Sequence, residues 1–258
     1  MASIRLNNVS VTFPIYDSRA RSLKRRAMAA VTAGRVNSNP AGKIGTDVKH
    51  HVVVRALDHV NLAIEHGARL GLIGRNGVGK STLLHVMAGI YVPEQGKVMV
   101  EGKIATLFGS FGIDPELTGR ENIELRGLYL GLSKTEIRNR LAAIIDFTEL
   151  GQFIDMPFRT YSAGMRARLD FAISTSIEAE ILLLDEGLGA GDASFTEKAG
   201  QRLQSMAGTA DIVVLASHSE YLLRSVCTHA ALMEAGRILA VGPIDDILKQ
   251  YRASLAAA

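Results

Sequence analysis

Short apolar runs alternate with helical patterns along most of the chain. The runs Arg69–Ile73, Ile181–Leu184 and Asp211–Ala216 are typical of buried strands. A hairpin is predicted from Ala230–Glu234 and Arg237–Val241. Strands that alternate with helices predict an α/β fold with a largely parallel sheet. The predicted helices are Lys80–Ala88, Gly119–Phe147, Ser162–Ser176, Ser194–Met206 and Ile244–Tyr251.

Near the N-terminus, two strand regions flank a stretch without periodicity. Polar and apolar residues alternate in Ile4–Leu6 and Val9–Phe13, and strand character resumes at His51–Arg55 and Asp58–Ile64. Residues 14–50 between them are predicted to be an insertion or loop. This segment carries seven basic residues and no acidic residue between Ser18 and Thr46.

The basic insertion is open to three interpretations. It is either a solvated loop or a contact for anionic lipid head groups or an acidic partner. Nucleic acid ranks third, because no aromatic residue lies between Arg19 and Lys43. No nucleic-acid partner is therefore predicted.

Composition indicates a globular protein of the cytoplasm. Of its 258 residues, 47% are apolar and 21% are charged, and the net charge is only +3. The apolar runs are shorter than the roughly 20 residues of a membrane helix, and the N-terminus lacks the pattern of a signal peptide. The single cysteine, Cys227, excludes an internal disulfide and suits a reducing compartment.

A glycine-rich loop follows the strand Arg69–Ile73 directly. Its sequence, Gly-Arg-Asn-Gly-Val-Gly-Lys-Ser-Thr, matches the P-loop pattern in full. Glycines allow backbone N–H groups to point into one concavity, and the following helix adds its positive end. The predicted ligands of ATP are Gly74, Asn76, Gly77, Gly79, Lys80, Ser81 and Thr82, with Ser81 also binding Mg²⁺.

Two acids end the apolar strand Ile181–Leu184. Asp185 is placed to hold Mg²⁺, and Glu186 is placed to polarise an attacking water. A strand that ends in an acid is common by itself, but its position after a P-loop favours the catalytic interpretation. The sequence contains no Asn-Lys-x-Asp or Thr-Lys-x-Asp motif, which recognises guanine, and this disfavours GTP as the nucleotide.

A third motif gives the chain its resemblance to a known family. Tyr161-Ser162-Ala163-Gly164-Met165 precedes a helix and is similar to the Leu-Ser-Gly-Gly-Gln signature of the ATP-binding-cassette ATPases. Only Ser162 and Gly164 match that signature. The resemblance covers nearly the whole chain and implies a single nucleotide-binding domain over residues 1–258. Its expected fold is an α/β P-loop core with an antiparallel β part and an inserted helical subdomain at about 110–165.

The resemblance also implies roles for residues outside these motifs. Ser162 and Gly164 are expected to act on ATP held by a second copy of the chain in a head-to-tail homodimer formed on ATP binding. Asp192 matches a loop that communicates across that dimer, and His218 matches a histidine that contacts the γ-phosphate and orients the water. Either Phe13 or Tyr16 is expected to stack on adenine.

One departure concerns the coupling to a membrane partner. The family usually has a glutamine between the core and the helical subdomain, and alignment places Gly109 there. A glycine has no side chain with which to ligate, so coupling must rely on Ser110, the backbone or water.

The segment Phe111–Asn122 is similar to ATPases that export O-antigen, capsule or teichoic-acid polysaccharides. This resemblance implies hydrolysis of ATP that powers glycan export at the cytoplasmic face of the inner or plasma membrane. A polytopic permease is the expected partner, and the basic insertion is a second candidate for membrane contact. No C-terminal carbohydrate-binding domain is expected. The alternatives are an ABC transporter for another substrate or a soluble ABC ATPase outside transport.

Overall fold

The computed structural model describes residues 1–14, 43–46, 52–108, 112–185 and 193–256. They form two compact units, one made of Met1–Glu101 with Val214–Ala258 and the other of Gly102–Val213. No helix among the described residues is long and apolar enough to cross a membrane.

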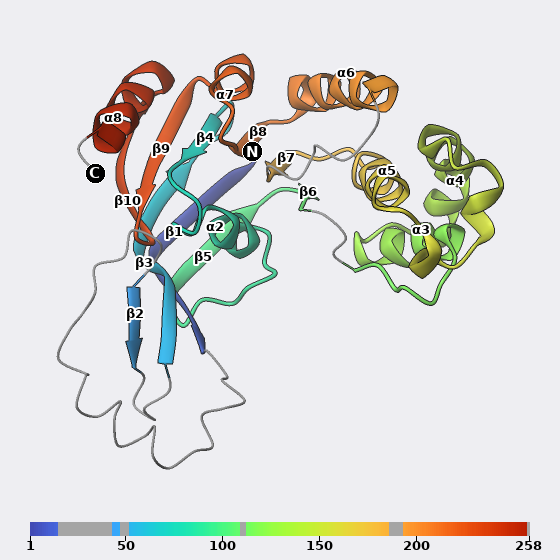
Figure 1. Ribbon diagram of the computed structural model, residues 1–258, viewed down its shortest axis with the longest axis horizontal. Coiled ribbons are helices and arrows are strands. Elements are labelled where there is room, and N and C mark those ends of the chain that lie inside the picture. The colour runs from blue at the N-terminus through green and yellow to red at the C-terminus, as the bar shows by residue number, and fades with distance from the viewer. Residues whose placement is uncertain (15–42, 47–51, 109–111, 186–192, 257–258) are drawn as a thin grey trace, which may run out of the picture. The chain divides into compact units, whose positions relative to one another are not determined.

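The first unit contains an antiparallel sheet (Figure 1). Its strand order is β2-β3-β1-β5, and alternate side chains of β1 are buried, as in Ile4 and Leu6. Lys43–Thr46, within the stretch predicted to be an insertion, forms strand β2 and pairs with β3. The strands are β1 (Ser3–Pro14), β2 (Lys43–Thr46), β3 (Val52–Ile64) and β5 (Gln95–Glu101).

The opening strand predicted from Ile4–Leu6 and Val9–Phe13 is the continuous strand β1, and the strand character predicted at His51–Arg55 and Asp58–Ile64 belongs to one strand, β3, from Val52 to Ile64. The break in the alternation of polar and apolar residues near Asn8 is a β-bulge, because the register of β1 on β3 shifts between Leu6 and Val9. Near this irregularity Asn8 and His59 both have φ of 54°, a left-handed conformation that is uncommon for residues other than glycine. A bulge interrupts the alternation of side chains without ending the strand.

A second sheet in this unit carries the predicted phosphate loop. Its strands follow the order β10-β9-β4-β8, with β4 parallel to β9 and β9 antiparallel to β10. Cys227 is buried after α7, which raises the pKa of its thiol to about 12. The elements are β4 (Arg69–Ile73), α2 (Lys80–Met87), β8 (Ile212–Ala216), α7 (Glu220–Val226), β9 (His229–Glu234), β10 (Arg237–Pro243) and α8 (Ile244–Ala256).

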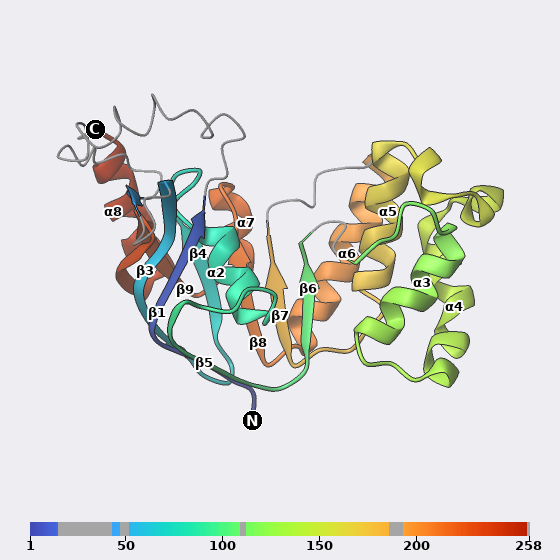
Figure 2. The ribbon, with the colours of Figure 1, turned by 90° about the horizontal axis from the view of Figure 1, so that it is seen from below.

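The second unit combines parallel strands with a group of helices (Figure 2). Strand β6 pairs in parallel with β7, and the order of strands is β8-β7-β6, with β8 crossing the boundary between the units. A core of apolar side chains, including Ile123, Leu169 and Ile173, joins the helices. The elements are β6 (Ile104–Leu107), α3 (Gly119–Tyr129), α4 (Lys134–Thr148), η1 (Gly151–Asp155), η2 (Phe158–Thr160), α5 (Ala163–Ser174), β7 (Ile181–Leu184) and α6 (Ala193–Thr209).

The single helical pattern predicted at Gly119–Phe147 is two helices. Helix α3 ends near Gly131, whose φ of 81° cannot continue a right-handed helix. Helix α4 then begins with a capping box, in which Ser133 and Glu136 satisfy each other's backbone N–H groups. The helical pattern of apolar residues continues from α3 into α4, but Gly131 and the capping box at Ser133 end one helix and begin the next.

A buried ion pair joins α3 to α5. The Arg126 guanidinium contacts the carboxylate of Asp170 and donates a second hydrogen bond, of 2.8 Å, to the Ser174 hydroxyl. The Arg126 side chain is 5% exposed, and its burial lowers the pKa of the guanidinium to about 10. Arg126 therefore stays charged at neutral pH and depends on Asp170 for compensation.

Candidate functional site

The phosphate loop lies between β4 and α2, as its sequence predicts. Gly74 and Gly79 have φ of 156° and 107°, in the region that favours glycine. A Cβ atom at Gly74 would lie 2.4 Å from the Met233 carbonyl oxygen, and one at Gly79 would lie 2.4 Å from that of Ala56. Both glycines are therefore required by the close approach of neighbouring backbone as well as by the turn.

Lys80 begins α2 and folds back over the loop. Its Nζ donates hydrogen bonds of 2.8 Å to the Gly74 carbonyl and 3.2 Å to the Arg75 carbonyl, and the residue is 7% exposed. The loop thus holds an ammonium group at its own concave side. Such a charge, together with the N-terminal end of α2, favours the binding of an anion.

His218 lies beside this lysine, although 138 positions separate the two residues. It is exposed in the turn after β8, and its Nε2 lies 3.2 Å from Lys80 Nζ. Because an ammonium can only donate, Nε2 acts as the acceptor, so the ring proton of neutral His218 sits on Nδ1. The structure therefore brings together two groups that the sequence predicts at the γ-phosphate.

The remaining predicted ligands divide between described and undescribed parts of the chain. Asn76, Gly77 and Ser81 are exposed on the rim of the loop, and Thr82 is half-buried. Asp185 follows β7 in the second unit, where its N–H donates to the Leu107 carbonyl over 3.3 Å. The predicted residues outside the described ranges are Tyr16, Gly109, Glu186 and Asp192.

Phe13 belongs to a group of aromatic rings in the first unit. Its ring meets that of Tyr91 edge-on at a centroid distance of 5.2 Å, and Tyr91 stacks on His85 at 5.1 Å. The Nδ1 atom of His85 lies 2.5 Å from the Ser81 carbonyl oxygen, next to the phosphate loop. Phe13 is one of the two rings predicted to stack on adenine, whereas its neighbours Tyr91 and His85, which have no motif around them, were not predicted.

The signature-like segment starts α5 in the second unit. Ser162 is the N-cap, and its hydroxyl accepts a 3.2 Å hydrogen bond from the Met165 N–H. A Cβ atom added at Gly164 would have the Ser162 hydroxyl oxygen as its neighbour among the described residues, at 4.0 Å. An open groove of about 850 Å³ borders this helix start and is also lined by Gln152 and Phe153 of η1. The helix N-terminus thus faces space for a ligand.

Tyr161 fixes this segment to η1. It is 3% exposed, and its hydroxyl donates a 2.6 Å hydrogen bond to the Phe153 carbonyl. Burial raises the pKa of the phenol, which therefore stays protonated as a donor. A Cβ atom on Gly119 would lie 2.3 Å from the Tyr161 hydroxyl oxygen, so the contact is closely packed.

Replacement of Tyr161 by phenylalanine should lower the free energy of unfolding by about 1 kcal/mol, because the Phe153 carbonyl loses its donor. Urea unfolding followed by circular dichroism measures this change. The matched control is Tyr129→Phe, since Tyr129 is 71% exposed and should tolerate the change. Equal stability of the two variants would show that the hydroxyl of Tyr161 contributes nothing.

Comparison with solved structures shows which fold the chain has. A dimeric ATP-binding cassette in a post-hydrolysis state, bound to ADP and Pi, superposes with a TM-score of 0.66. The two chains are 21% identical, and the match covers 93% of this chain and 98% of the other. An ATP-binding subunit of an ABC transporter also has a TM-score of 0.66, at 20% identity and with 96% and 92% of the two chains covered.

Comparison with curated proteins gives closer relatives. The O-antigen export system ATP-binding protein RfbE of Yersinia enterocolitica is 42% identical over 239 residues, which cover 92% of this chain and 97% of the relative. The teichoic acids export ATP-binding protein TagH of Bacillus cereus is 39% identical over 78% of this chain. The chain spans only 36% of that relative's length. The family model described as ABC transporter matches residues 57–189. The chain therefore belongs to the ABC transporter family, among its ATP-binding proteins.

Proposed function

We propose that this chain is the ATP-hydrolysing subunit of an exporter for a polysaccharide or a lipid-linked glycan. The observation that carries the ATPase part is the contact of Lys80 with His218 at the mouth of a complete phosphate loop. The substrate class is supported by the 42% identity to an O-antigen export protein over nearly the full length of both chains.

The proposed chemistry is the attack of water on the γ-phosphate, which yields ADP and inorganic phosphate. Backbone N–H groups of the loop, from Gly74 to Gly79, bind the phosphate oxygens, and Lys80 supplies positive charge to the β- and γ-phosphates. Glu186 polarises the water, and His218 orients it. Adenine stacks on Phe13 or Tyr16, and the Tyr91 ring that meets Phe13 supports the first choice.

Magnesium would be held by the Ser81 hydroxyl and the Asp185 carboxylate. Both are oxygen donors of the kind that Mg²⁺ prefers, and Ser81 is exposed at the start of α2. When bound, the ion would neutralise phosphate charge. The residues present therefore fit the ion.

Two copies are proposed to close head to tail around two nucleotides. Ser162 and Gly164 border a groove at a helix N-terminus, a geometry suited to a γ-phosphate supplied by the other copy. Asp192 would communicate across this dimer. The dimers, docked on a polytopic permease at the cytoplasmic face of the membrane, would couple closure and reopening to transport.

Substitution Glu186→Gln is expected to lower steady-state ATP hydrolysis at least about a hundredfold while ATP still binds, because a general base contributes that much or more. The trapped species should be a dimer that appears with ATP in size-exclusion chromatography with light scattering. Glu178→Gln, which changes an exposed carboxylate in the same unit, is the control. Normal turnover by Glu186→Gln would remove Glu186 from the mechanism.

Copurification tests the exporter assignment. The tagged chain is extracted from its native membranes in mild detergent, and its partners are identified by mass spectrometry. A stoichiometric polytopic membrane protein is expected. Recovery in the soluble fraction alone, with ribosomal or DNA-associated proteins, would overturn the exporter and leave the ATPase.

A further inference from the structure

The turn between β9 and β10 is hydrogen-bonded to the backbone of the phosphate loop. The Gly236 N–H donates a 3.0 Å hydrogen bond to the Val78 carbonyl of the loop. The same turn accepts from β3, because the Asp58 N–H donates a 2.9 Å hydrogen bond to the Gly236 carbonyl. The turn therefore links a strand of the antiparallel sheet to the loop through two backbone hydrogen bonds in series.

These hydrogen bonds orient a donor of the loop. The peptide unit between Val78 and Gly79 is trans, so its C=O and N–H point in opposite directions. With the Val78 carbonyl directed at Gly236, the Gly79 N–H points away from the turn. On the other side, the close approach of Gly79 to the Ala56 carbonyl leaves the loop little room to rotate. The orientation of the Gly79 N–H therefore depends on where the turn sits.

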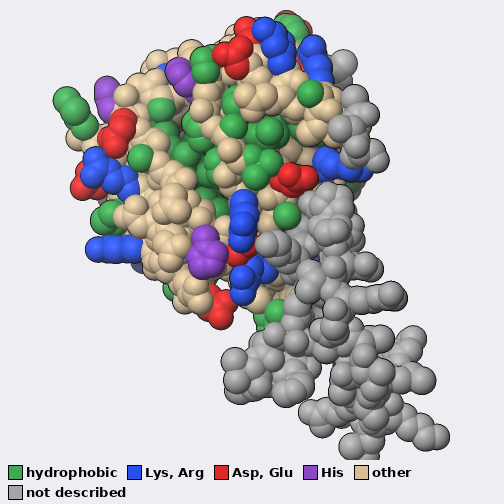
Figure 3. All heavy atoms as spheres, turned by 90° about the vertical axis from the view of Figure 1, so that its left-hand side faces the viewer, with side chains coloured by type: hydrophobic (Ala, Val, Ile, Leu, Met, Phe, Trp, Pro, Cys, Tyr) green, Lys and Arg blue, Asp and Glu red, His purple; other side chains and the backbone are tan. Residues whose placement is uncertain are grey.

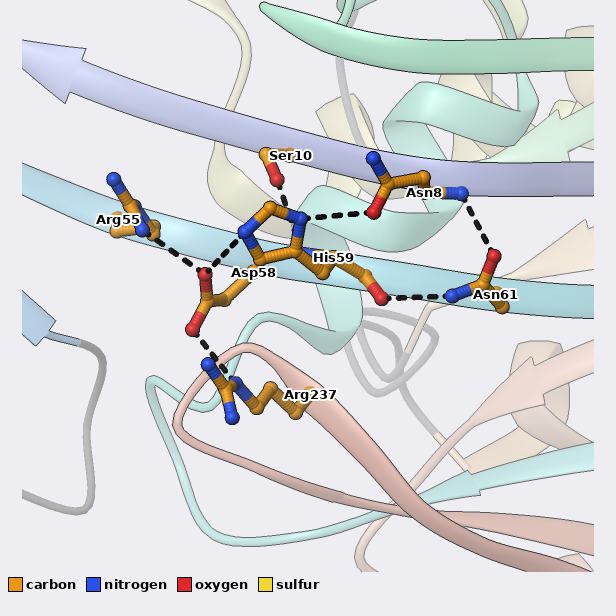
Figure 4. Close-up of polar contacts among 7 residues, drawn as sticks. All are labelled: Asn8, Ser10, Arg55, Asp58, His59, Asn61 and Arg237. Carbon is orange, nitrogen blue, oxygen red and sulfur yellow. Dashed lines mark hydrogen bonds and ion pairs between the residues drawn. The ribbon is translucent and has the colours of Figure 1, made fainter.

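A buried carboxylate, that of Asp58, holds this β9–β10 turn in place (Figure 4). Asp58, with a side chain only 1% exposed, accepts a 2.7 Å hydrogen bond from Arg237 Nε, directly after Gly236. Its other oxygen accepts a 3.1 Å hydrogen bond from Arg55. Ala235 has φ of 45°, a conformation that a non-glycine residue adopts only when its surroundings impose it. The Asp58–Arg237 pair supplies such a constraint.

The residue that follows Asp58 is held by a polar network at the bulge between β1 and β3. This residue, His59, has its N–H bonded to the Ser10 hydroxyl at 3.0 Å and its Nδ1 placed 2.8 Å from Asn8 Oδ1. An amide oxygen only accepts, so Nδ1 donates. These contacts hold the part of β3 that contains Asp58 against the neighbouring strand β1.

The arginine of this pair, Arg237, lies at the surface and can be substituted without disturbing the core. The Arg237 side chain is 50% exposed. Figure 3 shows the side that is on the left of Figure 1, where lysine or arginine and histidine side chains lie on the surface together with hydrophobic ones. A substitution of Arg237 therefore removes the ion pair without opening a cavity in the core.

We propose that Asp58 and Arg237 are a positioning pair for ATP binding. Their ion pair holds the turn Ala235–Gly236, and the turn orients the Val78–Gly79 peptide for the phosphates. This inference rests on the proposed function, in which the loop binds ATP. It assigns to the pair a role in affinity that is separate from its contribution to folding.

Isothermal titration of ATP into Arg237→Gln and Asp58→Asn tests the pair. Each variant should bind about tenfold more weakly than the wild type, the size of effect expected when a hydrogen-bonded charge is lost. Arg237→Lys should recover part of the affinity, because an ammonium can still pair with Asp58. The matched control is Glu65→Gln, which removes the exposed ion pair between Arg5 on β1 and Glu65 directly after β3, and its affinity should not change.

Two further readouts separate positioning from general stability. The ¹⁵N amide resonance of Gly79 in the nucleotide-free protein should shift in Arg237→Gln and stay in place in Glu65→Gln. If Asp58→Asn does not fold, Arg237→Gln decides alone. Wild-type affinity in folded Arg237→Gln, or an unmoved Gly79 resonance, would overturn the positioning role. Undiminished binding by Lys80→Ala would instead overturn the phosphate-loop function itself.

Discussion

Replacement of Lys80 by alanine is expected to weaken ATP binding about a hundredfold, because hydrogen bonds to a charged group contribute about 1.5–3 kcal/mol each. Lys80 is the buried cation of the loop, held over it by the carbonyls of Gly74 and Arg75. In the complex its ammonium would exchange these carbonyls for phosphate oxygens, which carry full negative charge. Isothermal titration with ATP measures the change.

Thermal unfolding provides an independent measure of the same effect. A ligand at about a hundred times its Kd stabilises a protein by about 2.7 kcal/mol, so ATP should raise the melting temperature of the wild type and leave that of Lys80→Ala almost unchanged. The control is Lys249→Ala on α8, whose side chain is 77% exposed. A nucleotide-dependent shift of wild-type size in Lys80→Ala would contradict the assignment of the phosphate loop.

Replacement of Asp170 by alanine is expected to destabilise the second unit by about 3–5 kcal/mol, the usual result of leaving one buried charge without its partner. The Arg126 guanidinium would remain buried between α3 and α5, where its hydrogen bond to the Ser174 hydroxyl supplies no compensating charge. Urea unfolding followed by circular dichroism measures the free energy. Asp155→Ala is the control, because Asp155 forms an exposed pair with Arg120 and its loss should barely move the midpoint.

The double variant Arg126→Met with Asp170→Leu sharpens this test. Removal of both charges leaves no uncompensated ion, and apolar side chains of similar size can then pack between the helices. The double variant should recover most of the stability that Asp170→Ala loses. A double variant as unstable as the single one would mean that packing, and not the unpaired charge, causes the loss.

Sequence patterns predicted the elements whose local signals are strong. Strand β4 at Arg69–Ile73 and the start of α2 at Lys80 lie where the glycine-rich pattern places them. Strand β7 at Ile181–Leu184 is an apolar run that ends in acids, and Ser162 caps α5 as expected. In each case a few neighbouring residues restrict the backbone, so no distant contact is needed to predict it.

Elements with weak local signals were missed. Helix α7, Glu220–Val226, is too short to show a helical period, and only Leu223 in it is buried. Strand β5, Gln95–Glu101, is exposed at its first three residues and therefore lacks a clear alternation. Tertiary pairing with β1 makes it a strand. Such elements owe their form to partners far away in the sequence.

The site shows the same division. The glycine-rich loop lies between β4 and α2, where its local pattern predicts it, and its ligands stay a prediction, whereas a place for His218 at the same site was expected only through the family resemblance. The Asp58–Arg237 pair joins positions 179 residues apart and has no local signal. The contact of Tyr91 with Phe13 joins rings far apart in the sequence and was likewise not predicted.

The packing of Gly119 against Tyr161 constrains how these two positions can vary during evolution. A side chain at position 119 would collide with the tyrosine hydroxyl, and also with the Ile154 carbonyl at 3.0 Å. A tyrosine at the start of the signature is therefore compatible with glycine at position 119 and not with a larger residue. Once tyrosine is present, that glycine is retained, because its replacement would push the signature away from η1.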